Sequence, residues 1–324
     1  MKNKFIVVSI LLTIVVIIES AFLFKPKEKI ELIDLYAKGR TSNTIDLTLK
    51  YINSDRFKDS SVSYPYMDRS REKYNGLTED QKKLYNEILE NVKNFKEFSY
   101  LAKDYSYEFL DSALYVSGIL LEDNPELRLY FKMDEITSND QTIGLKATYF
   151  MPYDPDGNNA SINKVKEEIA IFEKETDLIV QNMPSDLSTY DKYRYLATYI
   201  SLKTSYDHGG IGGAQVANAY GGIEGGLSIC EGYALAFEYL CKKANLWCQI
   251  VTGVVRNEAH AWNLVKLESG TYHVDVTWSD GDHTPISSNW YRYFMLFQEQ
   301  ILDDHEIDNN VVATGTRDFI MERG

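Results

Sequence analysis

Three residues in the second half of the chain have the types and positions needed for acyl transfer: Cys230, His260 and Asp275. Cys230 follows a glycine pair in the stretch GGLSICEGYALAFEYLC and opens a segment with helical periodicity. Because the first turn of a helix has unpaired N–H groups, it stabilises a thiolate and can bind a developing oxyanion. This position predicts a nucleophile. A small residue that fills space beside the glycines is the structural alternative.

The local pattern also predicts how this helix begins. Ser228 and Glu231 have the S-x-x-E spacing of a capping box, which makes Ser228 the expected N-cap and Cys230 the second helical residue. Cys230 lies off the expected buried stripe, at the end of the helix that can present a group to a ligand. That stripe consists of Tyr233, Phe237, Leu240, Cys241 and Ala244.

A cysteine nucleophile needs a base, and the base needs a group that orients it. His260 begins the segment HAWNLVKL, and Asp275 lies in the following segment TYHVDVTW. An ionised carboxylate between valines is costly to bury alone, so Asp275 should have a partner, and His260 is the natural candidate. With Ser269 and Gly270 as a two-residue turn, His260 lies opposite position 279, on the face that carries Asp275. Asp275 is then four residues out of register, so contact requires a longer loop or a bulge.

The chain that must position these residues changes from helices to strands. A glycine-rich loop from His208 to Gly226 has too many glycines for a packed element and allows tight turns beside a site. Helical patterns cover 77–95, about 104–121, 161–183 and 188–207, and a hairpin is expected from 127–133 and 143–150. Short connections predict antiparallel strands at 247–255, 260–267 and 271–278. This order predicts an α+β fold with helices packed on an antiparallel sheet.

The motifs C-x-G-Y-A, H-A-W-N and H-V-D-V-T-W, in this order, resemble the transglutaminase-like (papain-like cysteine) superfamily, and in particular its exported bacterial members. The resemblance covers roughly residues 77–305. It implies a papain-like core with the nucleophile at a helix N-terminus and a triad of Cys230, His260 and Asp275. The side chain that contacts the substrate or the oxyanion stays open between Tyr206, Gln215, Tyr220 and Trp262, the last being either core or cleft wall.

The remaining cysteines and histidines have ordinary interpretations. Cys241 and Cys248 are expected to be buried thiols, with a disulfide between them as the alternative in an exported chain. Their spacing does not match a zinc site. His273 shares strand parity with Asp275 and could support the site, although a surface position is favoured. The other three histidines, His305 among them, are expected in solvated loops.

The first 27 residues form a targeting segment. Lys2 and Lys4 precede an apolar run from Phe5 to Phe24, 20 residues that suffice to span a bilayer. We predict an uncleaved anchor with the rest of the chain extracytoplasmic; cleavage and secretion are the alternative. The predicted organisation is an anchor or signal segment at 1–27, a stalk at 28–76 and a transglutaminase-like domain at 77–324. That domain divides into a helical and hairpin part at 77–160 and a catalytic core at 161–305.

Composition limits the partners. A net charge of -14 and a pI of about 4.9 argue against nucleic acid as a partner. We expect a peptide or protein substrate, cell-wall or cell-surface material included, and no metal or organic cofactor. Hydrolysis of amide bonds is favoured over cross-linking, because amine transfer needs a site closed to water. The alternative is a non-catalytic binding or structural module at the cell surface.

Overall fold

The computed structural model describes residues 72–139, 141–154, 161–279, 292–308 and 311–317, all within one compact unit that spans Leu49–Gly324. The predicted anchor at 1–27 and the predicted stalk up to residue 71 lie outside the described residues. Within the described ranges, no helix is both long enough and apolar enough to cross a bilayer. The described chain begins with the short helix α3 (Glu72–Asn75).

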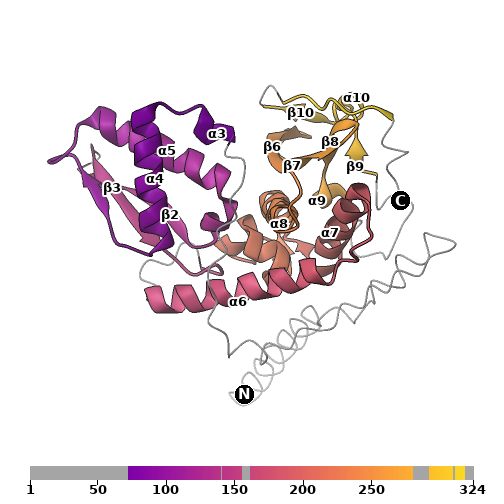
Figure 1. Cartoon of the computed structure of the whole chain (residues 1–324), viewed down its shortest axis with the longest axis horizontal. Helices are drawn as coiled ribbons and strands as arrows, with labels where there is room; N and C mark the ends of the chain where they lie inside the picture. The colour runs from indigo at the N-terminus through magenta and orange to yellow at the C-terminus, as the bar shows by residue number, and fades with distance from the viewer. Residues whose placement is uncertain (1–71, 140, 155–160, 280–291, 309–310, 318–324) are drawn as a thin grey trace, which may run out of the picture. The chain divides into compact units, whose positions relative to one another are not determined.

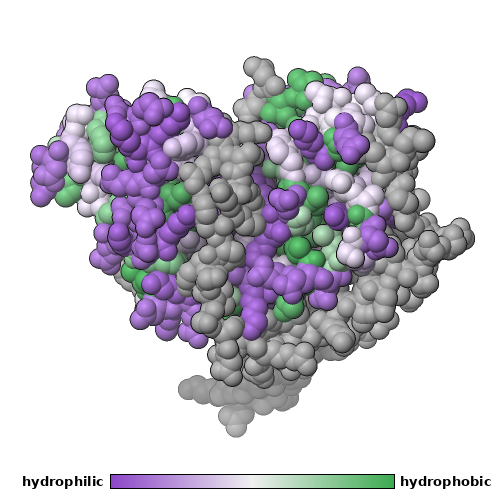
Figure 2. Space-filling view, viewed as in Figure 1, coloured by the Kyte–Doolittle hydropathy of each residue, from purple (hydrophilic) through white to green (hydrophobic). Residues whose placement is uncertain are grey.

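The N-terminal part combines helices with a small sheet (Figure 1). Thr78 caps α4 (Glu79–Lys93), and its exchange of hydrogen bonds with Gln81 forms a capping box. Helix α5 (Tyr107–Asp123) packs on α4, and the 3-10 turn η2 (Pro125–Leu129) leads from it into the sheet. The antiparallel strands β1 (Ser99–Leu101), β3 (Gln141–Tyr149) and β2 (Phe131–Ser138) lie in this order and include the predicted hairpin. Hydrophilic residues cover much of the visible face of this part in Figure 2.

Two further helices lead to the glycine-rich segment. Helix α6 (Ile162–Gln181) follows its predicted range, whereas α7 (Thr189–Lys203) ends four residues before its predicted limit of 207, because Ser205 and Tyr206 form a strand. The first residues of the glycine-rich segment, 208–211, are exposed, but its later part contains the 3-10 turn η3 (Ala214–Ala217) and the π-turn η4 (Gly221–Gly225). The prediction that this segment has too many glycines for a packed element is therefore wrong for its later part. A Cβ atom on Gly222 would lie 2.6 Å from the Cβ of Ala236 in α8 (Cys230–Lys243). Glycine therefore permits η4 to pack directly on α8.

Helix α8 is the central element. Every residue from Gly232 to Cys241 is buried, so the helix is enclosed on all sides and has no single buried stripe. The predicted capping box is wrong, because Ile229 is the N-cap and Ser228 belongs to β5 (Leu227–Ser228). β5 pairs in parallel with β4 (Ser205–Tyr206), and the Ser228 hydroxyl donates to the carbonyl of Val216 at 2.7 Å. Cys230 is consequently the first residue of α8.

A five-stranded antiparallel sheet packs against α8 in the order β10-β6-β7-β8-β9. Its strands are β6 (Cys248–Val255), β7 (Glu258–Leu267), β8 (Gly270–Val274), β9 (Phe294–Leu296) and β10 (His305–Ile307). The fold is α+β, with helices on an antiparallel sheet, as predicted. Figure 1 shows α8 lying against this sheet, with α7 beside it.

The β7–β8 hairpin differs from the predicted register. Leu267 pairs with Gly270, so residues 268 and 269 form the turn, and Gly270 has a φ of 129° that favours glycine. Asn263 pairs with Val274, where β8 ends. The prediction of a strand up to residue 278 is therefore wrong, because Val276–Ser279 form the short helix α9.

Gly253 in β6 determines how closely β10 can approach. A Cβ atom at this position would lie 1.9 Å from the carbonyl oxygen of Glu306 and 2.8 Å from the Trp262 ring. Ile307 pairs with Gly253, and His305 pairs with Val255. The missing side chain thus lets β10 join the sheet at the edge, beside β6.

Candidate active site

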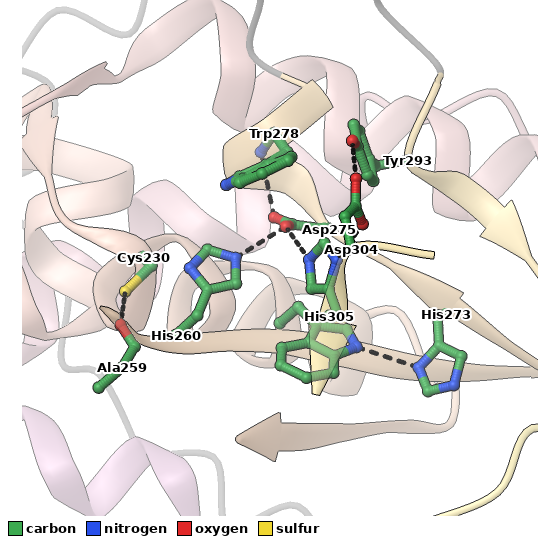
Figure 3. A network of polar contacts seen from close by, with 10 residues as sticks. Cys230, Ala259, His260, His273, Asp275, Trp278, Tyr293, Asp304 and His305 are labelled. Carbon is green, nitrogen blue, oxygen red and sulfur yellow. Dashed lines mark hydrogen bonds and ion pairs between the residues drawn. The ribbon is translucent and has the colours of Figure 1, made fainter. Parts of the chain in front are cut away.

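Cys230 lies at the N-terminal end of α8, and its side chain is only partly buried. Its Sγ atom is 4.0 Å from the carbonyl oxygen of Ala259 in β7 (Figure 3). The helix start leaves backbone N–H groups beside the sulfur, since Ile229 provides no side-chain cap. The thiol therefore occupies the positive end of a helix and faces the strand that carries His260.

His260 connects the thiol to Asp275. Its Nε2 atom is 2.8 Å from Oδ2 of Asp275, and Figure 3 shows the other ring nitrogen on the side of Cys230. Since the carboxylate accepts the Nε2 hydrogen, Nδ1 is the nitrogen available to the sulfur. The imidazole is thus oriented to exchange a proton between the thiol and a substrate.

The surroundings of His260 favour its charged form. Burial lowers the pKa of this histidine, but hydrogen bonds to Asp275 and to the Cys230 thiol outweigh burial and raise the pKa to about 9. The two partners also add attraction between opposite charges. At neutral pH the site therefore holds an imidazolium between a carboxylate and a sulfur atom.

Asp275 is fully buried at the point where β8 gives way to α9. Its Oδ2 accepts hydrogen bonds from Nε2 of His260 at 2.8 Å and from Nε2 of His305 at 3.2 Å. Its Oδ1 accepts from the backbone N–H of Trp278 at 3.1 Å. Burial raises the pKa of this carboxyl, and the hydrogen bonds from the two histidines outweigh burial and lower the pKa overall. Asp275 is therefore an ionised carboxylate.

His305 is the member of the site that the sequence did not predict. It lies in β10 and is 1% exposed, so its predicted place in a solvated loop is wrong. Besides Asp275, it contacts Asp304, with 2.6 Å between Nδ1 and Oδ1. Asp304 also accepts a hydrogen bond from the Tyr293 hydroxyl at 2.5 Å. These contacts extend the line from Cys230 through His260 and Asp275 to a second histidine and a second carboxylate.

His273 and Trp262 support the site from inside the sheet. Both are fully buried, so the favoured surface position of His273 is wrong and Trp262 belongs to the core, away from a cleft wall. The Trp262 ring stacks beside His260, and its Nε1 donates to Nδ1 of His273 at 3.0 Å. The other nitrogen of His273 donates to Gln298. Burial lowers the pKa of His273 to about 4, which matches a neutral ring.

Of the other residues proposed for substrate or oxyanion contact, Tyr206 lies beside Cys230. Burial raises the pKa of the Tyr206 hydroxyl, as does the charge of Cys230, while a hydrogen bond from the Cys230 backbone partly opposes the rise. Tyr220 instead packs on Phe172 of α6 and on Tyr153. Gln215 lies in η3, where its carbonyl accepts from the N–H of Asn218. The positions of these three side chains favour Tyr206 for a role at the thiol.

A pocket of about 840 Å³ opens at Cys230 and His260. Residues of α8, β6 and β7 line the pocket, together with residues of α3, α5 and η2 from the N-terminal part. Charged side chains line much of it: Lys73, Glu122, Asp123, Arg128, Glu231, Glu238, Lys242 and Asp308. The pocket is large enough for several residues of a polar peptide.

Metal binding is a further property that His260, Asp275 and His305 could have, because one ligand atom of each lies within 4.8 Å of the others. The two nitrogen-to-oxygen distances, 2.8 and 3.2 Å, are those of hydrogen bonds. We therefore describe this cluster as a hydrogen-bond network. Elsewhere, Cys241 and Cys248 are buried thiols that form no disulfide with each other, as their first interpretation predicts.

Residues 178–276 match the family model of the Transglutaminase-like superfamily. The matched range contains Cys230, His260 and Asp275, together with α8 and the strands β6 to β8. With the α+β architecture described above, this match identifies the fold as transglutaminase-like, of the papain-like type.

Known proteins share parts of the chain. The Kyphoscoliosis peptidase of Homo sapiens is 33% identical over 97 residues, and that of Mus musculus is 32% identical over 97 residues. The aligned segment is 25% of this chain and 15% of each relative, so the chain matches a small part of their length. A solved TGase is 17% identical with a TM-score of 0.30, over 48% of this chain and 45% of its own. A candidate cysteine protease of Cytophaga hutchinsonii is 12% identical with a TM-score of 0.31, over 57% and 66%.

Proposed function

We propose that this chain, whose residues 178–276 are transglutaminase-like, is a cysteine acyl-transfer enzyme that hydrolyses amide bonds of a peptide or protein. The observation that carries the proposal is the line of contacts from Cys230 through His260 to Asp275, of which Cys230 and His260 line an open pocket. The relatives named as peptidases agree with a peptidase-like function. The proposal also includes the class of substrate and the location of the catalytic domain outside the cytoplasm.

In the first half of the reaction, the Cys230 thiolate attacks the carbonyl carbon of the scissile amide, and the carbonyl oxygen becomes an oxyanion. The tetrahedral intermediate collapses when the imidazolium of His260 gives its Nδ1 proton to the leaving amine. Asp275 keeps the Nε2 hydrogen engaged, so the ring cannot rotate away from the sulfur. The products are a free amine and a thioester on Cys230.

In the second half, the neutral His260 takes a proton from water, and the hydroxide attacks the thioester carbon. Collapse releases the carboxylic acid and restores the thiolate beside the imidazolium. The N–H groups at the start of α8 are donors for the oxyanion in both halves. The Tyr206 hydroxyl contacts the backbone of Cys230, and we assign this side chain to the site of the oxyanion.

Hydrolysis is favoured over amine transfer because the pocket beside Cys230 has polar, charged walls that water can reach. A primary amine could use the same three residues to form a cross-link, which is the second outcome of the assay below. We also propose that residues after the N-terminal apolar segment act outside the cytoplasm, on cell-wall or cell-surface peptides. That location follows from the sequence of the first 27 residues.

The test is the pH dependence of Cys230 alkylation by iodoacetamide, with peptide mapping to separate the three cysteines. We expect Cys230 to react rapidly at pH 6 to 7, where an ordinary thiol with a pKa near 8.5 is mostly protonated. The variant His260→Ala should lose this reactivity, while alkylation of Cys241 and Cys248 stays slow in both proteins because they are buried. Slow alkylation of Cys230 in the native protein would instead favour a non-catalytic surface module.

Substrate turnover then separates hydrolysis from cross-linking. A mixture of unlabelled peptides is incubated with the enzyme, with and without a fluorescent primary amine, and the products are read by mass spectrometry. Hydrolysis gives new carboxylic termini in both mixtures. Cross-linking gives amine-labelled products in the second mixture only, and Cys230→Ser is the inactive control.

A further inference from the structure

His305 lies between two carboxylates, and this arrangement has a consequence for the charge of the site. We propose that His305 is held as a doubly protonated imidazolium and acts as a positioning residue for Asp275. Its effect on catalysis rests on the function proposed above. Its protonation state does not, because that state follows from contacts within the protein.

The two contacts of His305 require a hydrogen on each nitrogen of its ring. Nε2 of His305 is 3.2 Å from Asp275, and Nδ1 is 2.6 Å from Asp304. A neutral imidazole carries one N–H, so one of the two nitrogens would direct a lone pair at a carboxylate oxygen. With a hydrogen on each nitrogen, both contacts become charge-assisted hydrogen bonds.

Neither carboxylate is a favourable site for the proton that the second contact of His305 requires. Asp275 already accepts from His260 and from the Trp278 N–H, so its oxygens act as acceptors. Asp304 accepts the hydroxyl of Tyr293 at its other oxygen, so both of its oxygens also act as acceptors. The proton therefore resides on the imidazole.

Aromatic rings surround His305 and separate it from solvent. The ring centroids of Trp262, Trp278 and Tyr293 lie 5.0, 5.2 and 5.7 Å from the centroid of His305. Since His305 is 1% exposed, these rings and the two carboxylates replace water around the charge.

The other titratable neighbours are compatible with this charge. His260 is the second cation on Asp275, at 5.5 Å between ring centroids, and His273 stays neutral because burial lowers its pKa to about 4. Burial and the hydrogen bond to Asp304 raise the pKa of Tyr293 to about 12, so its hydroxyl keeps its hydrogen. Arg256 lies over the Trp278 ring at 4.7 Å, on the outside of the cluster.

Two positive histidines on one carboxylate have a predictable effect. His305 fixes the orientation of Asp275 and also repels the charge on His260, which restrains the basicity of His260. Neutralising His305 should therefore raise the pKa of His260 further, on the order of one pH unit for charges at this separation. A residue that only filled space would not change this pKa.

The variant Asp304→Asn separates charge from packing. The amide has nearly the same shape, its oxygen can accept from Tyr293, and its NH₂ group can donate to Nδ1 of His305. The ring then needs only one hydrogen, on Nε2, and becomes neutral while its contacts remain. Asp303→Asn is the matched control, because Asp303 is the exposed neighbour and loses the same charge.

The experiment is nitrogen NMR of the full-length protein labelled with ¹⁵N-histidine, with His305→Gln used to assign the signal among five histidines. We expect both nitrogens of His305 to be protonated from pH 6 to 8 in the native protein and in Asp303→Asn. In Asp304→Asn we expect one protonated nitrogen and a higher pKa of His260. A neutral His305 in the native protein at pH 7 would overturn the proposal, as would an unchanged His260 in Asp304→Asn. If His305 is an imidazolium but the protein turns over no substrate, only the proposed function fails.

Discussion

Replacing Asp275 with asparagine should lower the pKa of His260 by more than about one unit. The amide oxygen can still accept the Nε2 hydrogen, so the ring keeps its place, but the negative charge is lost. The imidazolium depends on that charge, because burial alone favours the neutral ring. The change therefore tests the source of the site's electrostatics directly.

The magnitude follows from the native value. A pKa of about 9, against an ordinary histidine value of 6.5, corresponds to about 3 kcal/mol in favour of the charged ring. Burial is the largest single influence and opposes the rise, so the favourable interactions together exceed 3 kcal/mol. Asp275 and Cys230 supply them, and the hydrogen bond to Asp275 is the largest. Removing at least half of the sum lowers the pKa by more than about one unit.

The assay is an NMR titration of His260 from pH 5 to 11, assigned by comparison with His260→Ala. This measurement needs no substrate, so it is independent of the reaction. Asp104→Asn is the control for the loss of one acidic charge, because Asp104 is exposed. We expect a midpoint near 9 in the native protein and in the control, and a midpoint at or below about 8 in Asp275→Asn.

Two results would refute the reasoning. A midpoint near 6.5 for His260 in the native protein would mean that Asp275 and Cys230 do not stabilise the charged form of its ring. A midpoint near 9 in Asp275→Asn would mean that Cys230 alone supplies the stabilisation. In that case Asp275 would serve the fold, and the line of contacts would lose its catalytic interpretation.

Three further predictions concern stability and the pocket. The free energy of unfolding should be greatest near pH 6.5. Above pH 6.5, the free energy of unfolding should fall by about 3 kcal/mol as the pH rises to about 9, because the pKa of His260 is raised in the native state. Below pH 6.5, it should fall by a similar amount as the pH drops to about 4, because the pKa of His273 is lowered in the native state. Chemical denaturation at several pH values would show a flat profile if this reasoning is wrong. Gly253→Ala should destabilise the protein by about 1–3 kcal/mol, because its Cβ would collide with the β10 backbone, whereas Gly118→Ala, with no atom nearby, should not. Finally, five acidic and three basic side chains line the pocket, so peptides with lysine or arginine should be cleaved faster than acidic ones, with a difference that shrinks in high salt. Equal rates at low salt would contradict this.

Two of the three chemical residues, Cys230 and Asp275, could be predicted because each breaks a local rule, and His260 followed as the natural partner of Asp275. Cys230 lies at a helix start beside glycines, and Asp275 is a carboxylate between valines in a strand pattern. Such conflicts between local pattern and residue type concentrate at functional sites. His260 and Asp275 are only 15 residues apart, on the two strands of one hairpin. Over such a short distance, the alternation of side chains along the strands indicates that both lie on the same face of the sheet.

The details of that hairpin could not be predicted, since a turn can shift by one residue without changing the pattern. Turn residues 268 and 269, followed by Gly270 at positive φ, change the partner of every strand residue by two positions. The strand also ends at Val274, and the bend into α9 supplies the Trp278 N–H to Asp275. Glycine was similarly misinterpreted in the segment before α8, where Gly222 permits close packing and not an open loop.

His305 was missed for a different reason, yet the chain holds a clue to it. A fully buried carboxylate has about four acceptor sites, and one histidine satisfies only one of them. Burial of Asp275 between two valines therefore requires more hydrogen-bond donors than His260 alone provides. The second histidine reaches Asp275 only because β10 pairs with β6 across Gly253, a contact between segments some 50 residues apart. A local sequence pattern cannot predict such a strand pairing. The need of Asp275 for a second hydrogen-bond donor can nevertheless be derived from its burial, and His305 is that donor.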